Sequence, residues 1–185
     1  IIAYTANPER SVHNKSTTAG TAISSDKGAY FINHDLKHPV FPRQFWTQGK
    51  THASSRWFPT LDHPSQKHTQ TLQITYPDTM ISISNGKLMS SKNIPQSKEK
   101  TDWWIMEKPH SVYLTMLGLG NWVKTEQNVR SAKTQIPVNS FVEPAFQNAA
   151  YNHFKHTAEM IDFFSNYTGV DFPWGKFDQV SVRDF

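Results

Sequence analysis

The chain has 185 residues and a formal net charge of +4, which is enough length for one domain and part of another. It contains no cysteine, so disulfide scaffolds, Cys-based zinc sites and thiol nucleophiles are excluded. No apolar run is long enough to cross a membrane. Lysines gather only loosely between residues 87 and 100, which predicts a solvated loop and no nucleic-acid surface. An aromatic content of 13% favours a β-rich core.

The first third of the chain predicts short strands separated by irregular segments. Ile1–Thr5 resembles a strand entered midway, and residues 6–28 predict a loop because Ser, Thr, Asn and Gly dominate there. Ala29–Ile32 predicts a strand. Residues 33–43, with two prolines, predict an irregular connection before a second strand at Phe45–Gln48.

Alternating apolar and polar residues mark the middle of the chain. The alternation covers residues 71–76, breaks at Pro77 and resumes at Ile81 and Ile83. Asn85-Gly86 then predicts a hairpin turn, because both residue types tolerate positive φ. Four later segments extend the β pattern: Trp103–Met106, Val112–Leu117, Trp122–Val123 and Ile136–Val138. Strands at this spacing predict a mainly β fold of antiparallel sheets, saddle-like or a sandwich.

The hydrophobic period changes from 2 to 3.6 after Pro144 and predicts one or two helices. Thr157 is placed to cap the second helix, and Gly169 suits its left-handed end. A last strand is expected from about Phe177 to the final residue. An unpaired strand at a chain end needs a partner, which predicts a segment of a larger protein. The period change divides the segment into residues 1–142 and 143–185.

Two histidine patterns resemble metal sites. His34 and His38 flank an acidic residue, as in H-E-x-x-H, but Pro39 follows at once and disfavours the helix that this motif requires. His153 and His156 lie three residues apart in the predicted helical region, with Glu159 three further on. A polar helix edge explains them better than a metal. Asp171, Asp178 and Asp184 have no spacing that pairs two carboxylates.

The segment Arg56–Pro64, with sequence Arg-Trp-Phe-Pro-Thr-Leu-Asp-His-Pro, predicts a rigid corner between two strands. Two prolines limit its backbone, and Asp62 can accept hydrogen bonds from amides of the turn. The pattern by itself names no function.

Several motifs taken together resemble the aminopeptidase N family of zinc metallopeptidases, which also contains the leukotriene hydrolases. The motifs are Phe45–Gly49, Arg56–Pro64, Ser84–Gly86, Trp104 with Lys108–Leu114, Glu159–Phe164 and Thr168–Asp178. Their order and spacing resemble the later part of the amino-terminal β domain followed by the start of the catalytic domain. The resemblance covers the chain from about residue 28 onward.

The resemblance implies a zinc aminopeptidase that removes amino-terminal residues from peptides, with the β domain walling one side of the cleft. The family's Gly-Ala-Met-Glu-Asn segment, its H-E-x-x-H helix and its later Glu ligand are not in this sequence. We therefore expect zinc in the parent protein and none on this segment, which is expected to be inactive alone. The expected partners are the peptide substrate and the remainder of the catalytic domain. The Trp-Thr-Gln-Gly variant most resembles bacterial members exported to the periplasm or surface.

The resemblance also implies substrate-binding residues at Gln48 and Lys50. The family residue at Gln48 lines the first substrate pocket. Two residues later the family has Gln or Glu, which accepts hydrogen bonds from the substrate's amino terminus, whereas this chain has Lys50. Two other hypotheses follow: a non-enzymatic β-rich module that binds carbohydrate or peptide through exposed Trp46, Trp57, Trp103 and Trp104, and an inactive family member that serves as a scaffold.

Overall fold

The computed structural model describes residues 1–6, 27–50, 52–130 and 135–185. These residues divide into two compact units, residues 1–120 with 183–185 and residues 121–182. Most of the loop expected at residues 6–28 lies outside the described residues. The described part is mainly β, as the sequence predicts, and none of its helices is long and apolar enough to span a membrane.

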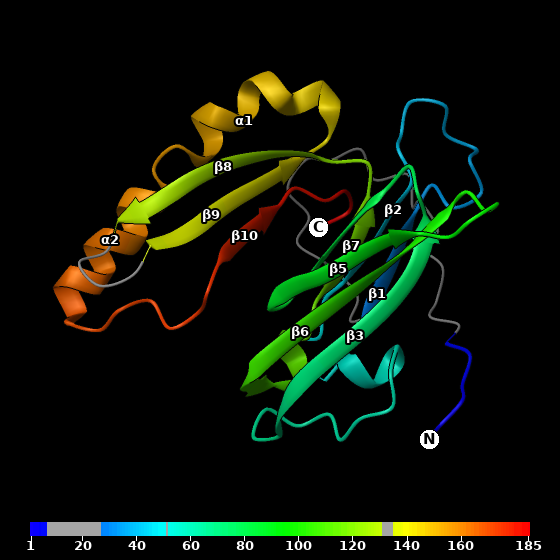
Figure 1. Ribbon diagram of the computed structural model, residues 1–185, viewed down its shortest axis with the longest axis horizontal. Helices are drawn as coiled ribbons and strands as arrows, with labels where there is room; N and C mark the ends of the chain where they lie inside the picture. The colour runs from blue at the N-terminus through cyan, green and yellow to red at the C-terminus, as the bar shows by residue number, and fades with distance from the viewer. Residues whose placement is uncertain (7–26, 51, 131–134) are drawn as a thin grey trace. The chain divides into compact units, whose positions relative to one another are not determined.

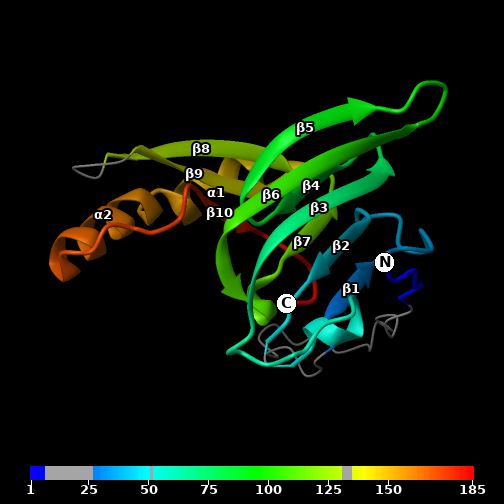
Figure 2. The same cartoon turned by 60° about the horizontal axis from the view of Figure 1, so that its bottom comes forward.

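The first unit contains two antiparallel sheets (Figures 1 and 2). One has the order β1-β2-β7-β4, and the other has the order β3-β6-β5. The strands are β1 (Ala29–Ile32), β2 (Gln44–Thr47), β3 (Lys67–Pro77), β4 (Ile81–Ser84), β5 (Lys87–Asn93), β6 (Glu99–Ser111) and β7 (Leu117–Gly120). Two 3-10 turns, η1 (Ser54–Arg56) and η2 (Val112–Leu114), follow β2 and β6.

Inward-facing residues of both sheets form the core of the first unit. Aromatic and β-branched residues at alternate positions along the strands bury their side chains in this core. Tyr30 stacks on Trp46 at 3.9 Å between ring centroids, and the backbone of Arg183 bonds the side chains of Gln44 and Trp46. The last three residues therefore belong to the first unit.

The second unit is a three-stranded sheet with helices. The antiparallel strands β8 (Val123–Arg130) and β9 (Gln135–Val142) form a hairpin, and β10 (Phe177–Val180) pairs with β9 in parallel. The turn η3 (Pro144–Phe146) leads into α1 (Gln147–Phe154), which α2 (Thr157–Thr168) follows. Val129, Ile136 and Val138 form the core, against which Ala158 and Ile161 of α2 pack.

Several expected elements are wrong. No strand forms at Ile1–Thr5, and Val112–Leu117 is the turn η2 followed by the start of β7. The final strand ends at Val180, five residues before the expected end at Phe185. The lysines between residues 87 and 100 lie on β5, β6 and the turn between them, where a solvated loop was expected. Lys108-Pro109-His110 continues β6, because a register shift opposite His68 and Gln70 accommodates the proline.

Asn85-Gly86 does not close a hairpin. β4 belongs to the four-stranded sheet and β5 to the three-stranded one, so these two residues carry the chain from one sheet to the other. Of the pair, Gly86 alone has positive φ, at 78°, whereas the predicted turn requires it at both positions. A Cβ on Gly86 would lie 2.0 Å from the Ile105 carbonyl oxygen, so the crossing requires glycine.

The sequence predicted the C-terminal end of α2 but not the capping of its N-terminal end. His156 occupies the N-cap position and no side chain caps this end, because the Thr157 hydroxyl instead donates to Gln179 Oε1 at 2.8 Å. Gly169 ends the helix at φ 70°, as predicted. Along the sequence, the division between the two compact units falls between Gly120 and Asn121. The boundary between the β domain and the catalytic domain, expected near residue 142, stays a prediction. The β8–β9 hairpin groups with the helices because they share one core.

Candidate functional site

The segment Gln48–Lys50 directly follows β2 and leads into the turn η1. The Gln48 amide donates to the Gly28 carbonyl at 2.9 Å, which extends the β1–β2 pairing by one bond. The Gln48 side chain is half-buried and that of Lys50 is exposed. The backbone at this position is thus held by the sheet, while the two predicted site residues reach toward the surface. We call Gln48–Lys50 the β2 corner.

Gly49 fixes the β2 corner from the other side. A Cβ at this position would lie 2.3 Å from Ser54 Oγ and 2.7 Å from the Tyr113 carbonyl oxygen, so only glycine allows this approach. Ser54 Oγ donates to the Val112 carbonyl at 3.2 Å, and the Ala53 amide donates to the Gly49 carbonyl at 3.0 Å. The turns η1 and η2 therefore clamp the β2 corner between them.

The segment Arg56–Pro64 forms the predicted rigid connection between β2 and β3. Asp62 Oδ2 accepts a hydrogen bond from the Ser55 amide at 2.9 Å, as expected for an acid that bonds its own turn. His52 Nδ1 lies 2.6 Å from the Asp62 carbonyl. The connection follows the β2 corner and η1 along the chain, and these bonds stiffen it.

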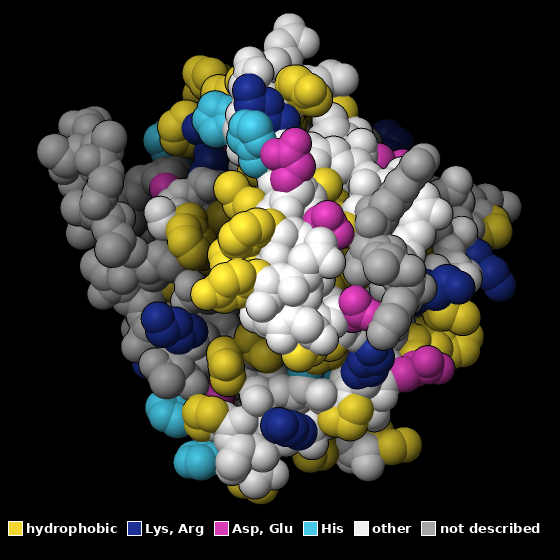
Figure 3. Space-filling view, turned by 90° about the vertical axis from the view of Figure 1, so that its left-hand side faces the viewer, with side chains coloured by type: hydrophobic (Ala, Val, Ile, Leu, Met, Phe, Trp, Pro, Cys, Tyr) yellow, Lys and Arg dark blue, Asp and Glu magenta, His cyan; other side chains and the backbone are white. Residues whose placement is uncertain are grey.

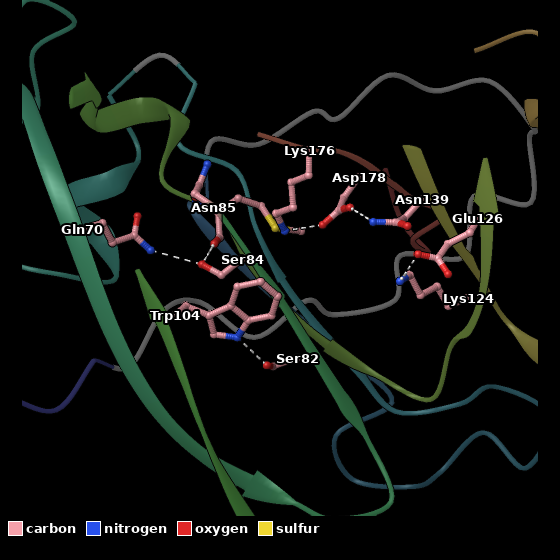
Figure 4. Close-up of polar contacts among 11 residues, drawn as sticks. Gln70, Ser82, Ser84, Asn85, Trp104, Lys124, Glu126, Asn139, Lys176 and Asp178 are labelled. Atoms are coloured by element: carbon pink, nitrogen blue, oxygen red, sulfur yellow. Dashed lines mark hydrogen bonds and ion pairs between the residues drawn. The ribbon is translucent and has the colours of Figure 1, made fainter. Parts of the chain in front are cut away.

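A polar network at the end of β4 holds the chain between η2 and β7 (Figure 4). Asn85 accepts from the Met116 amide at 2.6 Å and donates to the Leu114 carbonyl at 3.0 Å. Ser84 Oγ donates to the Met116 carbonyl at 2.7 Å, and Gln70 Nε2 donates to Ser84 Oγ at 3.1 Å. The residues of the sheet crossing thus also anchor the segment that follows η2.

A second network lies between the two sheets, around the buried carboxylate of Asp102. Tyr76 and Ser82 both donate hydroxyl hydrogen bonds to Asp102 Oδ2, the second at 2.5 Å. Trp104 Nε1 donates to Ser82 Oγ at 2.8 Å (Figure 4), and the Ser82 amide donates to the Tyr76 hydroxyl at 3.1 Å. Burial raises the pKa of Tyr76 well above its usual value, and the bond to Asp102 adds to the effect. This network ties β3, β4 and β6 together.

The second unit holds a largely buried ion pair between Lys176 and Asp178 (Figure 4). Asp178 Oδ1 also accepts a hydrogen bond from Asn139 Nδ2 at 2.6 Å, which links β10 to β9. Burial lowers the pKa of Lys176, and the neighbouring Asp178 offsets part of that effect. Sequence reasoning missed this pair, because Lys176 precedes the strand expected from Phe177 and was assigned to no strand face.

The histidine patterns do not form metal sites in the described residues. His34 and His38 lie in an irregular loop that Asn33 organises, since Asn33 Oδ1 accepts from the His38 amide at 3.0 Å. His153 and His156 do not share one helix, because α1 ends between them, and His156 instead pairs with Glu159 at 2.9 Å. No group of three or more His, Asp or Glu side chains in the described ranges could hold a metal ion.

Comparisons with known proteins support the family. The Peptidase M1 N-terminal domain model matches residues 22–114. The chain is 26% identical to glutamyl aminopeptidase of Mus musculus over 128 residues, which cover 69% of this chain and 13% of that protein. It is 22% identical to aminopeptidase N of Canis lupus familiaris over 166 residues, which cover 88% of this chain and 17% of that protein.

Two solved structures share the fold. The first is a two-domain M1 zinc metallopeptidase bound to L-tryptophan, with a TM-score of 0.65 and 17% identity over 74% of this chain and 31% of that one. The second is aminopeptidase A of Legionella pneumophila with aspartic acid, with a TM-score of 0.68 and 17% identity over 75% of this chain and 17% of that one. The chain therefore belongs to the M1 peptidase family, and its residues 22–114 match the N-terminal domain of that family. It spans about an eighth of the glutamyl aminopeptidase that it matches.

Proposed function

We propose that this chain forms one wall of the substrate cleft of a zinc-dependent aminopeptidase. In this proposal the Gln48 side chain contacts the first residue of the peptide. Membership of the M1 family supports the proposal, and so does the rigidity of the β2 corner. A positioned side chain assists binding only if its backbone is fixed, and here Gly28, Ser54 and Tyr113 restrain it.

The metal and the reacting groups belong elsewhere in this proposal. The described residues contain no set of donors that fits a catalytic zinc, so no step of peptide hydrolysis is assigned to them. The chain alone is then expected neither to bind catalytic zinc nor to cleave peptides.

The exposed face of α2 supports a partner within the same enzyme. Ala158 and Ile161 pack against the core of the second unit, yet the side chains on the outer face of α2 are apolar as well. Those outer residues are Met160, Phe163, Phe164 and Tyr167, which are 56–78% exposed. Figure 3, viewed from the side where Figure 1 draws α2, shows hydrophobic side chains gathered on this surface. We propose that the remainder of the catalytic domain covers them, because a patch of this kind normally marks an interface.

Lys50 limits what the β2 corner can do. An ammonium group about 4 Å from a substrate amine would be repelled by about 4 kcal/mol at an effective dielectric constant near 20. Lys50 must therefore point away from the substrate amine, or other groups must bind that amine, or the enzyme must be a poor aminopeptidase.

Two measurements test the proposal. The purified 185-residue chain should show neither stoichiometric zinc nor chelator-sensitive cleavage of an amino-acid arylamide, and finding both would contradict it. In the whole enzyme, Gln48→Ala should raise KM several-fold through loss of a hydrogen bond of about 1 kcal/mol. Gln73→Ala, on an exposed position of β3, is the matched control and should leave KM unchanged. Equal effects of the two variants would remove Gln48 from the site.

A catalytically inactive scaffold of the same family is the second candidate, and Lys50 favours it. Its signature would be a whole protein that binds a peptide without hydrolysing it. The β-rich binding module loses its main support, since Trp46 and Trp104 are only 2% and 7% exposed. Of the four tryptophans in that hypothesis, Trp103 alone is exposed.

A further inference from the structure

Two histidines face each other where β3 and β6 meet near the turn η2. His68 and His110 are directly opposed in the antiparallel ladder, and their ring centroids are 4.7 Å apart. His110 is buried, with 3% of its surface exposed, and His68 is half-buried. The register shift between His68 and Gln70 begins at this pair.

The contacts of His110 fix the tautomer of its ring. Its Nδ1 lies 3.3 Å from the Lys108 carbonyl, and because a carbonyl only accepts, Nδ1 must carry the proton. Its Nε2 is buried without a hydrogen-bond partner among the described residues.

His68 is disposed to remain neutral. Its Nε2 lies 3.3 Å from the hydroxyl of the buried Thr115, which can donate to an unprotonated nitrogen. Burial lowers the pKa of His68, and the charge of a protonated His110 lowers it further. His68 thus resists protonation for reasons visible in its geometry.

The other charged groups on these two strands do not offset the cost of a proton on His68. Lys67 and Lys108 flank the histidines on β3 and β6 and carry charge of the same sign, and the exposed Glu107 of β6 forms no ion pair with either ring in the described residues. The loop beside His68 contributes Phe58, Pro59, Thr60 and Leu61, which are uncharged. On that loop the Asp62 carboxylate accepts from the Ser55 amide, His63 bonds Ser65, and the backbone of Tyr113 in η2 packs against Gly49.

The pair lies next to the contacts that clamp the β2 corner. His110 is followed by Ser111 and then by η2, whose Val112 carbonyl accepts from Ser54 and whose Tyr113 backbone packs on Gly49. The Val112 amide donates to the Gln66 carbonyl at 3.2 Å, two residues before His68. Separation of the two rings would therefore pull directly on η2.

We propose that His68 and His110 form an acid-sensitive latch that holds η2, and through η2 the β2 corner, while His68 is neutral. Uptake of a proton by His68 separates the two strand ends and frees the β2 corner. The proposal goes beyond the proposed function and does not depend on it, since it concerns the backbone of the β2 corner and not peptide cleavage.

The direction of the pH effect follows from proton uptake. An opened chain binds a proton near pH 6.5, the ordinary histidine value, whereas the latched state binds it only at lower pH. The latch is thus fully closed above about pH 6.5 and weakens as the pH falls below that value. For each proton taken up, the opening constant rises by up to about tenfold per pH unit.

Amide hydrogen exchange on the 185-residue chain tests the latch. Between pH 7.5 and pH 5.5, the protection factors of the Gln48 and Ala53 amides should fall by about tenfold after correction for the intrinsic rate. In His68→Gln, which keeps a polar partner for Thr115 but does not titrate, this fall should disappear. The Ser181 amide of the second unit, which donates to Phe141, should keep its protection throughout.

His153→Gln, an exposed histidine of α1, is the matched control and should behave like the unmodified chain. Should His68→Gln fail to fold, an NMR titration of the unmodified chain gives the same answer. The His68 ring should titrate below pH 6.5, and the Gln48 and Ala53 amide shifts should follow the same curve. Unchanged protection at pH 5.5, an equal fall in His68→Gln, or a His68 midpoint at or above 6.5 would overturn the latch.

Discussion

Gly49→Ala is the sharpest test of the structure around the β2 corner. The new methyl group would lie 2.3 Å from Ser54 Oγ and 2.7 and 2.9 Å from the carbonyl oxygen and Cα of Tyr113. Ser54 can rotate away, but the two Tyr113 contacts are backbone atoms, so η2 or the β2 corner must move. Overpacking of this kind costs about 1–3 kcal/mol.

A smaller stabilising effect, on the unfolded chain, opposes the cost of overpacking. Alanine restricts the unfolded chain and stabilises by up to about 1 kcal/mol where the native conformation suits it. Gly49 is not among the glycines with positive φ, so this gain applies. The net loss is on the order of 1–2 kcal/mol, which lowers Tm by roughly 2–8 °C for a chain of this size.

Urea unfolding and thermal melts of matched variants check the magnitude. Gly175→Ala is the control, because a Cβ there would meet nothing within 4 Å, and its stability should be unchanged or slightly higher. Gly49→Ala combined with Ser54→Ala should remain destabilised, since the Tyr113 contacts persist. A Gly49→Ala variant as stable as the parent would show that the β2 corner is not clamped.

Two further substitutions probe the buried polar groups. Tyr76→Phe should lower the free energy of unfolding by about 1–3 kcal/mol, because Asp102 and the Ser82 amide each lose a buried partner. Lys176→Met should cost about 3 kcal/mol, since it leaves the carboxylate of Asp178 largely buried without its cation. Both values are measured by urea unfolding.

Each of these two substitutions has a control variant in the same region. Thr75→Ala alters an exposed hydroxyl next to Tyr76 and should cost less than Tyr76→Phe. Adding Asp178→Asn to Lys176→Met should restore part of the loss, because the amide can be buried without a counter-charge. Equal costs in the first comparison would argue against the network, and no recovery in the second would argue against the ion pair.

The order of elements was readable from local patterns. Alternation at residues 71–76 and 81–84 marked β3 and β4, and the period change after Pro144 marked the helices. Gly169 ended α2 as expected, because a left-handed terminus favours glycine whatever surrounds it. Family membership was likewise predictable, since it depends on the order and spacing of motifs.

The position of the candidate site was only partly predictable. Gln48 and Lys50 came from the resemblance, and their role stays a prediction. The rigidity of the β2 corner came from Gly49 meeting Ser54 and Tyr113, more than fifty residues apart in sequence. His68 and His110 likewise face each other because of the register between β3 and β6. The two residues are 42 positions apart in the sequence, so no local pattern predicts their contact.

By itself the sequence determined the family, the mainly β composition and most strand positions, because these depend on residues adjacent in the chain. The tertiary structure alone decided which sheet each strand joins. Asn85-Gly86 has the composition of a hairpin turn, yet the neighbours available to β4 and β5 belong to different sheets. The tertiary structure also grouped the β8–β9 hairpin with the helices and paired β10 in parallel with β9. These pairings are decided by the burial of apolar strand and helix faces against residues distant in the sequence. The free energy gained by that burial exceeds the conformational preference of a local turn sequence.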